Sequence, residues 1–254
     1  MTPNAPLPLK YEPDFEVAEK DEEKTQQELV KTLLEISDIT YKDTSLGLRS
    51  VHAKAHGLLR GELQVLTLDQ PFAQGMFARA KSYAVMLRLS ASPGDLLDDR
   101  VSTTRGMALK VIGVDGPRLP GAEGTITQDF LMINAPAFLA PSANKFLSSL
   151  KLLASTTDRI PRLKLALAAV ARGAEKFLEA VGTESGALKG MGGHPHTNVL
   201  GETFFSVVPF LYGPYMAKWQ LAPVSPELIA LKDALVDLQN HPNGLRDAVV
   251  RHFA

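Results

Sequence analysis

Hydrophobic positions along the chain follow two different periods, and the change of period separates helical from extended segments. Residues 21–37 begin with acidic residues and then place apolar side chains at near-helical spacing, which predicts an amphipathic helix. From residue 58 onward, hydrophobic residues recur at nearly every second position. Alternation predicts strands at residues 63–68, 83–91, 107–114 and 128–133, and strands in sequence with short connections favour an antiparallel sheet or barrel.

The second half of the chain returns to a helical pattern and then to shorter apolar segments. Helices are predicted over residues 143–182 with a break at Pro161, strands over 203–208 and 215–222, and terminal helices over 226–252 with an interruption at 241–244. Residues 1–20 are predicted to be an extended N-terminal arm, which either stays loose or wraps a partner subunit. The expected fold class is α+β, with residues 21–254 forming one domain on an antiparallel β-barrel with flanking helices.

Composition removes several classes of function. The chain of 254 residues has 27 Lys and Arg against 28 Asp and Glu, so its net charge of −1 does not favour nucleic acid or an anionic membrane as partner. It has no cysteine, which excludes disulfides, thiolate nucleophiles and iron–sulfur clusters. No leader or membrane-spanning run is apparent, and the common nucleotide-binding and hydrolase motifs are absent, so a cytoplasmic protein is expected.

Residues 48–57 concentrate the candidate chemistry. Arg49, His52 and His56 come just before an alternating segment, so a reactive side chain could be held at the mouth of a sheet. Arg88 and Ser90 alternate onto one face of the strand at 83–91. Two further histidines, His194 and His196, are spaced as metal ligands, but the glycines and the proline around them indicate a turn.

Four fragments resemble the core of the haem catalases in their order and spacing. They are RSVHAK at residues 49–54, RLS at 88–90, RGMALK at 105–110 and QDFLMINAP at 128–136. Residues 193–206 and 212–218 look like the compact catalase-related subgroup, and the resemblance covers roughly residues 45–222. It implies a catalase-type barrel with haem as cofactor.

The resemblance also implies a role for each matched side chain. His52 falls on the distal histidine, which takes a proton from bound peroxide and returns it to the far oxygen. Asn134 falls on the asparagine that orients peroxide, and Ser90 on the serine that holds the histidine ring. The positions that would surround the haem are Arg49 and Arg88, matching arginines near its carboxylates, and Phe138 and Phe146, matching aromatic residues near the haem and its channel.

The sequence departs from the family pattern at some positions. Ile133 replaces one asparagine, Leu139 replaces a phenylalanine, and STTRG at residues 102–106 replaces an Arg-Asp-Pro-Arg-Gly element. The family's axial tyrosine belongs to a downstream Arg-x-x-x-Tyr element. This chain ends at Ala254 before any such element, so truncation is expected and the iron ligand is unassigned.

The expected function is haem-dependent breakdown of hydrogen peroxide or organic hydroperoxides by a catalase-like or peroxidase-like oxidoreductase. One alternative is rearrangement of lipid hydroperoxides, as in the allene-oxide-forming relatives. A second alternative is a truncated, non-catalytic module for haem binding or protein interaction. The expected partner is a small peroxide, and the proline-rich arm and the resemblance favour a homo-oligomer.

Overall fold

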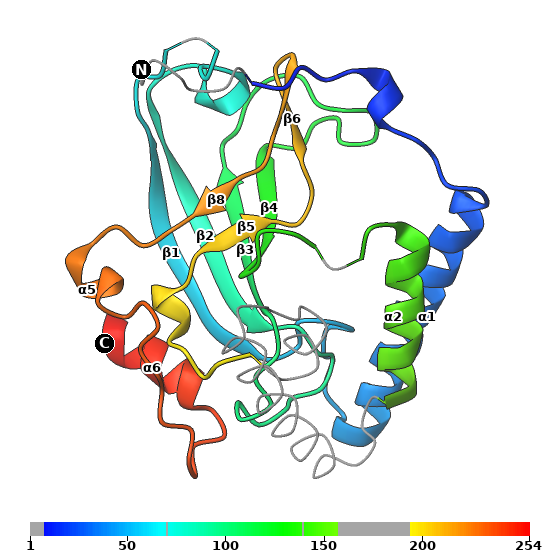
Figure 1. The fold of residues 1–254 in the computed structure, drawn as a ribbon, viewed down its shortest axis with the longest axis vertical. Helices are drawn as coiled ribbons and strands as arrows, with labels where there is room; N and C mark the ends of the chain where they lie inside the picture. Colours follow the sequence, from blue (N-terminus) through cyan, green and yellow to red (C-terminus); the bar gives the residue numbers. More distant parts are fainter. Residues whose placement is uncertain (1–7, 70, 139, 157–193) are drawn as a thin grey trace, which may run out of the picture.

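The fold is built on one curled, antiparallel sheet with helices at its edges (Figure 1). The computed structural model describes residues 8–69, 71–138, 140–156 and 194–254. The sheet has the strand order β1-β2-β3-β4-β5-β8. Its strands are β1 (Ala55–Val65), β2 (Lys81–Ala91), β3 (Arg105–Ile112), β4 (Thr127–Ile133), β5 (Phe204–Ser206) and β8 (Gln220–Leu221).

The register of the long strands separates a core face from an open face. Leu89 is paired with Met107, and these side chains share the core face with buried Val85, Val111 and Phe204. On the open face Ser90 is paired with Gly106, which in turn is paired with Ile133. Apolar side chains stay exposed there, most of all Leu58 at 65% and Leu131 at 64%. One face of the sheet is therefore well packed and the other is not.

Within the described residues the sheet does not close into the barrel that the sequence predicts. Its outer strands are β1 and β8, and within the described residues no ladder joins them. The sheet tapers toward β8, because β5 has three residues and β8 only two, so that edge offers few backbone groups for further pairing. The architecture is a mixed α and β fold on a half-barrel sheet.

A short helix at the C-terminal end covers the β1 side of the core. Helix α6 (Gly244–Phe253) places Val249 against Gly57, where a Cβ atom would lie 2.9 Å from the valine Cγ1. The buried carboxylate of Asp99 accepts a hydrogen bond from Leu245 N at 2.9 Å and pairs with Lys54 Nζ at 2.7 Å. This ion pair therefore ties the start of β1 to the start of α6.

The strand predicted at residues 215–222 is divided between two sheets. Its first part, β7 (Tyr215–Ala217), pairs with β6 (Phe210–Tyr212), and its last part is β8 in the main sheet. The N-terminal arm runs beside this hairpin, since Met216 N donates to Leu9 O and Tyr11 N donates to Pro214 O, each at 2.9 Å. A single turn of 3-10 helix, η1 (Pro13–Phe15), follows.

Two helices form a separate layer beside the sheet (Figure 1). Helix α1 (Glu22–Thr44) is longer than predicted and packs on α2 (Ala143–Thr156) through a small apolar cluster around Ile36 and Leu150. The helix predicted after Pro161 lies outside the described residues. The predicted terminal helices are α5 (Pro226–Ile229), only one turn long, and α6. Within the described chain, no helix has the length and apolarity needed to cross a bilayer.

Two further single turns of 3-10 helix complete the description: η2 (Gly75–Phe77) and η3 (Val199–Gly201).

Candidate functional site

His52 is held in an uncommon backbone conformation next to the sheet. Its φ of 53° lies in the left-handed region, which residues other than glycine rarely adopt. Its N–H donates to Ser92 O at 2.8 Å, and its carbonyl accepts from Nη2 of Arg88 at 2.7 Å. These bonds fix the residue from both sides. Strained conformations of this kind concentrate at functional sites, so the backbone adds a second reason to examine this residue.

The ring of His52 lies on the open face of the sheet. Its Nδ1 is 3.0 Å from Ser90 Oγ. A Cβ atom built on Gly106, the partner of Ser90 in β3, would lie 2.4 Å from Cε1 of the ring and 2.6 Å from Nδ1. The imidazole therefore occupies the space that any other residue at position 106 would fill. Ser90 and Gly106 together determine where the ring lies.

The surroundings of His52 keep its ring neutral. Burial, followed by the charges of Arg88 and Arg49, lowers the pKa of His52 from 6.5 to about 4. The ring is therefore a hydrogen-bonding base at neutral pH and carries no charge. When Nδ1 holds the ring hydrogen and donates it to Ser90 Oγ, the lone pair is on Nε2.

The two arginines form a cationic edge beside this histidine. Arg88 donates to the carbonyls of His52 and Ala53, while Arg49 is exposed. No carboxylate pairs with either guanidinium among the described residues. Two cations without carboxylate partners among the described residues, with exposed Leu58 opposite Arg88 in the sheet, suit a ligand with an apolar body and carboxylates.

Asn134 belongs to a different cluster from His52. Its Oδ1 accepts from Arg105 N at 2.9 Å, and its Nδ2 lies 2.6 Å from His194 Nε2 and 2.7 Å from Glu202 Oε2. The Nδ1 of His194 is 2.9 Å from Pro195 O and donates to it, which leaves Nε2 as an acceptor for Asn134. Both amide hydrogens of Asn134 are thus engaged within the protein.

Arg105 and Glu202 form the buried centre of this second cluster. The Arg105 side chain, 1% exposed, is ion-paired with Glu202 and donates to Thr197 O at 2.7 Å and to Pro195 O at 3.0 Å. Because Arg105 and Gly106 point to opposite faces of β3, this cluster lies on the core side and His52 on the open side. The sequence alone did not indicate what four residues of the matched fragments contribute to the two clusters. These residues are Arg105, Gly106, His194 and Glu202.

His56 lies where the β1 register shifts between Ala55 and Gly57, and it is fully buried. It is 1% exposed, and neither ring nitrogen has a hydrogen-bond partner among the described residues. Burial, followed by the charges of Arg105, Lys54 and Arg88, lowers the pKa of His56 to about 3. The two histidines therefore differ in their contacts, since His52 is bonded to Ser90 and His56 has no such partner among the described residues.

Phe138 and Phe146 pack against each other, with ring centroids 5.6 Å apart. Leu139 lies outside the described residues. Tyr212 donates its hydroxyl hydrogen to Phe72 O, and Tyr215 belongs to β7. In the described part of the chain, no cluster of three or more histidine or acidic side chains could hold a metal ion. No described side chain is assigned as an iron ligand.

Comparison with known proteins gives a distant likeness. No family model matches the sequence, and no curated protein matches it. A solved structure described as that of a bacterial catalase is similar to this chain with a TM-score of 0.47 and 15% sequence identity. The similarity covers 98% of this chain and 45% of that chain, so this chain spans less than half the length of the catalase it matches. Function therefore has to be inferred from the residues of the site.

Proposed function

We propose that this chain contributes the distal half of a haem site that breaks down hydrogen peroxide or organic hydroperoxides. The observation that carries the proposal is the placement of a neutral His52 ring, bonded to Ser90 and packed on Gly106, on an open sheet face beside two arginines without carboxylate partners. The resemblance of four sequence fragments to haem catalases supports the same reading. Bound haem would supply the electrons for cleavage of the O–O bond.

His52 is the proposed acid and base. Its Nε2 lone pair accepts the proton from the near oxygen of the hydroperoxide and delivers it to the far oxygen. The far oxygen then leaves as water from hydrogen peroxide, or as an alcohol from an organic hydroperoxide. The low pKa of about 4 has two consequences: the ring is free to accept a proton at neutral pH, and the protonated ring is a strong enough acid to return it.

Ser90 and the arginines support this step in different ways. In the proposed tautomer Ser90 Oγ accepts the Nδ1 hydrogen, which leaves Nε2 unprotonated. In this proposal Arg49 and Arg88 hold the haem carboxylates, and Phe138 with Phe146 would form an aromatic wall of the ligand site. The exposed apolar side chains of Leu58 and Leu131 would be covered by the haem or by further protein.

The resemblance implies that Asn134 orients the peroxide, but here Asn134 belongs to the core-side cluster and not to the face that carries His52, so this role would require its side chain to leave that cluster. Both amide hydrogens are bound by His194 and Glu202, so neither can be donated to a substrate in this arrangement. The oxygen Oδ1 accepts one bond from Arg105 N and retains a second lone pair. Rearrangement of the Asn134 amide is therefore part of the proposed binding step.

A haem titration followed by a turnover assay tests the proposal. The purified chain is titrated with haem, and the Soret band gives affinity and stoichiometry. His52→Ala should keep the Soret band and lose at least about 100-fold in peroxide turnover, the usual scale for removing a general acid or base. The matched control is His241→Ala, because His241 is exposed and away from the sheet's open face.

Three outcomes separate the alternatives. Unchanged turnover in His52→Ala contradicts the catalytic assignment. Absence of a Soret band contradicts haem binding and favours a non-catalytic interaction module. Faster reaction with a fatty-acid hydroperoxide than with hydrogen peroxide, yielding a rearranged product in place of an alcohol, favours the lipid hydroperoxide alternative.

A further inference from the structure

The segment that carries His52 is held on its C-terminal side by hydrogen bonds and an ion pair. Backbone hydrogen bonds of 2.8 to 3.1 Å join residues 52–54 to residues 91–93. The ammonium of Lys54 donates to two backbone carbonyls at 2.6 Å and pairs with Asp99 at 2.7 Å. These contacts fix positions 53 and 54 independently of helix α1.

The two residues directly before His52 contact helix α1. The hydroxyl oxygen of Ser50 is 2.9 Å from that of Ser37. The side chain of Val51 packs against the apolar cluster around Ile36 that joins α1 to α2. The N-terminal side of His52 is therefore held by one hydrogen bond between hydroxyl groups and by apolar packing, and both come from the helix layer beside the sheet.

Gly94 confines the same segment from the other side. A Cβ atom built on Gly94 would lie 2.3 Å from Ser50 O and 2.8 Å from Ile36 Cγ2. Both distances are far inside van der Waals contact, so Ser50 and Ile36 can come this close to residue 94 only because it has no side chain. The backbone of Ser50 therefore lies in a narrow space between α1 and Gly94.

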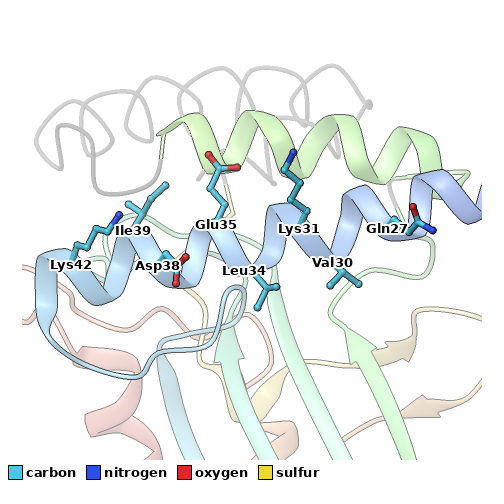
Figure 2. A pocket seen from close by; sticks show the side chains of 8 residues that line it. All are labelled: Gln27, Val30, Lys31, Leu34, Glu35, Asp38, Ile39 and Lys42. Carbon is cyan, nitrogen blue, oxygen red and sulfur yellow. The ribbon is translucent and has the colours of Figure 1, made fainter.

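These contacts belong to the buried side of α1. Ile36, Ser37 and Thr40 lie within one turn of the helix, and Ile36 and Thr40 are 0% and 1% exposed. The Oγ1 of Thr40 also donates to Ser37 O at 3.0 Å. Val30 and Leu34, by contrast, project away from α2 (Figure 2) and are 58% and 61% exposed. Ser37 is therefore placed by the same packing that buries Ile36.

We propose that Ser37 and Gly94 are positioning residues that hold residues 50–51 and so keep His52 in the left-handed conformation that brings its ring to Ser90. A φ of 53° is unfavourable for a histidine, so it persists only while contacts on both sides of the residue enforce it. The importance of this placement for turnover rests on the proposed function, in which His52 is the acid and base. The placement itself does not depend on haem.

NMR spectra of the haem-free chain test the placement directly. Ser37→Ala removes the hydroxyl that Ser50 contacts. It should shift the ring resonances of His52 and raise the pKa of His52 toward 6.5, because a displaced ring regains water. Ser37→Thr keeps a hydroxyl and should give the wild-type spectrum. Ser148→Ala removes an exposed serine hydroxyl from α2 and should leave the His52 resonances unchanged.

Gly94→Ala tests the other side of the segment and should have the larger effect, because the added methyl group meets the backbone of Ser50 and not a movable side chain. The matched control is Gly47→Ala, since a Cβ atom on Gly47 would have no heavy atom within 4 Å. Far-UV circular dichroism shows whether each variant is folded. If Gly94→Ala does not fold, the comparison of Ser37→Ala with Ser37→Thr still decides the result.

Turnover by the haem-loaded chain separates positioning from substrate binding. Ser37→Ala should lower kcat about tenfold and leave KM unchanged, because a misplaced acid and base weakens the transition state more than the bound substrate. Ser37→Thr should restore kcat.

Wild-type His52 resonances in a folded Ser37→Ala chain overturn the proposal. So does a change in Ser148→Ala as large as that in Ser37→Ala. Absence of peroxide turnover in the wild-type chain contradicts the proposed function instead, and the haem-free NMR comparison then still decides whether Ser37 and Gly94 position His52.

Discussion

The imidazole of His52 lies where the side chain of residue 106 would be if that residue were not glycine. The distance from a Cβ built on Gly106 to the ring Cε1 is 2.4 Å, far inside van der Waals contact. Gly106 is paired with Ser90, whose hydroxyl oxygen is 3.0 Å from Nδ1 of the same ring. Two neighbouring strands thus determine the ring position through one hydrogen bond and one missing side chain.

Gly106→Ala should displace the His52 ring without unfolding the sheet. The added methyl group has to push the ring off Ser90, and such overpacking costs about 1–3 kcal/mol. The loss of the Nδ1 contact should appear as a change in the ring resonances of His52 in NMR spectra. Gly61→Ala is the matched control, since its Cβ would meet Val85 Cγ2 at an ordinary 3.5 Å. Identical His52 resonances in both variants would contradict the described packing.

Asn134→Ala should weaken the link between the end of β4 and residues 194–202. It removes an acceptor for Arg105 N and leaves Glu202 Oε2 and His194 Nε2 without their amide donor. Unsatisfied buried groups cost about 1–3 kcal/mol each, so the unfolding free energy in urea should fall by at least that amount. Asn144→Ala, at an exposed position of α2, should change it little. Equal effects of the two substitutions would show that the Asn134 contacts do not stabilise the fold.

Glu202→Gln should be strongly destabilising. The Arg105 guanidinium is 1% exposed, and removal of its anionic partner leaves a buried charge without compensation. Breaking a buried pair in this way typically costs about 3–5 kcal/mol. The exposed pair between Lys110 and Asp129 provides the comparison, and Asp129→Asn should cost less than about 1 kcal/mol. Urea unfolding curves of both variants measure the difference.

Acid should destabilise the chain partly through His56. Its pKa is about 3 in the folded state against an ordinary 6.5, so the unfolded state binds the extra proton first as pH falls. The stability associated with the neutral ring is complete above pH 6.5 and is lost progressively as pH drops toward 3. The same sign applies to His52, whose pKa is about 4.

His56→Leu isolates this contribution. At pH 8 its unfolding free energy should stay within about 1.5 kcal/mol of the wild type, because the ring has no hydrogen-bond partner among the described residues and the volume is similar. Between pH 6.5 and 4 the variant should lose less stability than the wild type. Parallel stability curves over that range would contradict the low pKa of His56.

Two of the long strands, β2 and β4, follow from the sequence alone, whereas β1 was predicted at residues 63–68 and is observed at Ala55–Val65. Alternation places Val85, Leu87 and Leu89 on one face of β2, and the observed strand at Lys81–Ala91 contains the predicted segment. The same holds for β4, predicted at 128–133 and observed at Thr127–Ile133. Hydrophobic and polar residues alternate along a half-buried strand, so such a strand can be predicted without knowledge of its tertiary contacts.

Other features were decided by tertiary contacts. The segment at 215–222 reads as one strand, but it is divided because β6 and β5 are different pairing partners. Barrel closure was predicted and is not seen, since closure depends on edge lengths that no local period encodes. Helix α1 likewise continues to Thr44, past the predicted end at residue 37, with Thr40 buried in the added part.

The candidate site likewise combines features that the sequence predicts with features that depend on the tertiary structure. The sequence singled out His52 and ranked it above His56, but only the three-dimensional structure shows one ring against Ser90 and the other buried without a hydrogen-bond partner among the described residues. It also draws Asn134 into the Arg105 and Glu202 cluster. Sequence specifies which side chains a strand offers to each face. The sequence does not specify which distant side chains contact these strand residues. That depends on the path of residues 194–202 beside the sheet, and the packing of the whole fold determines this path.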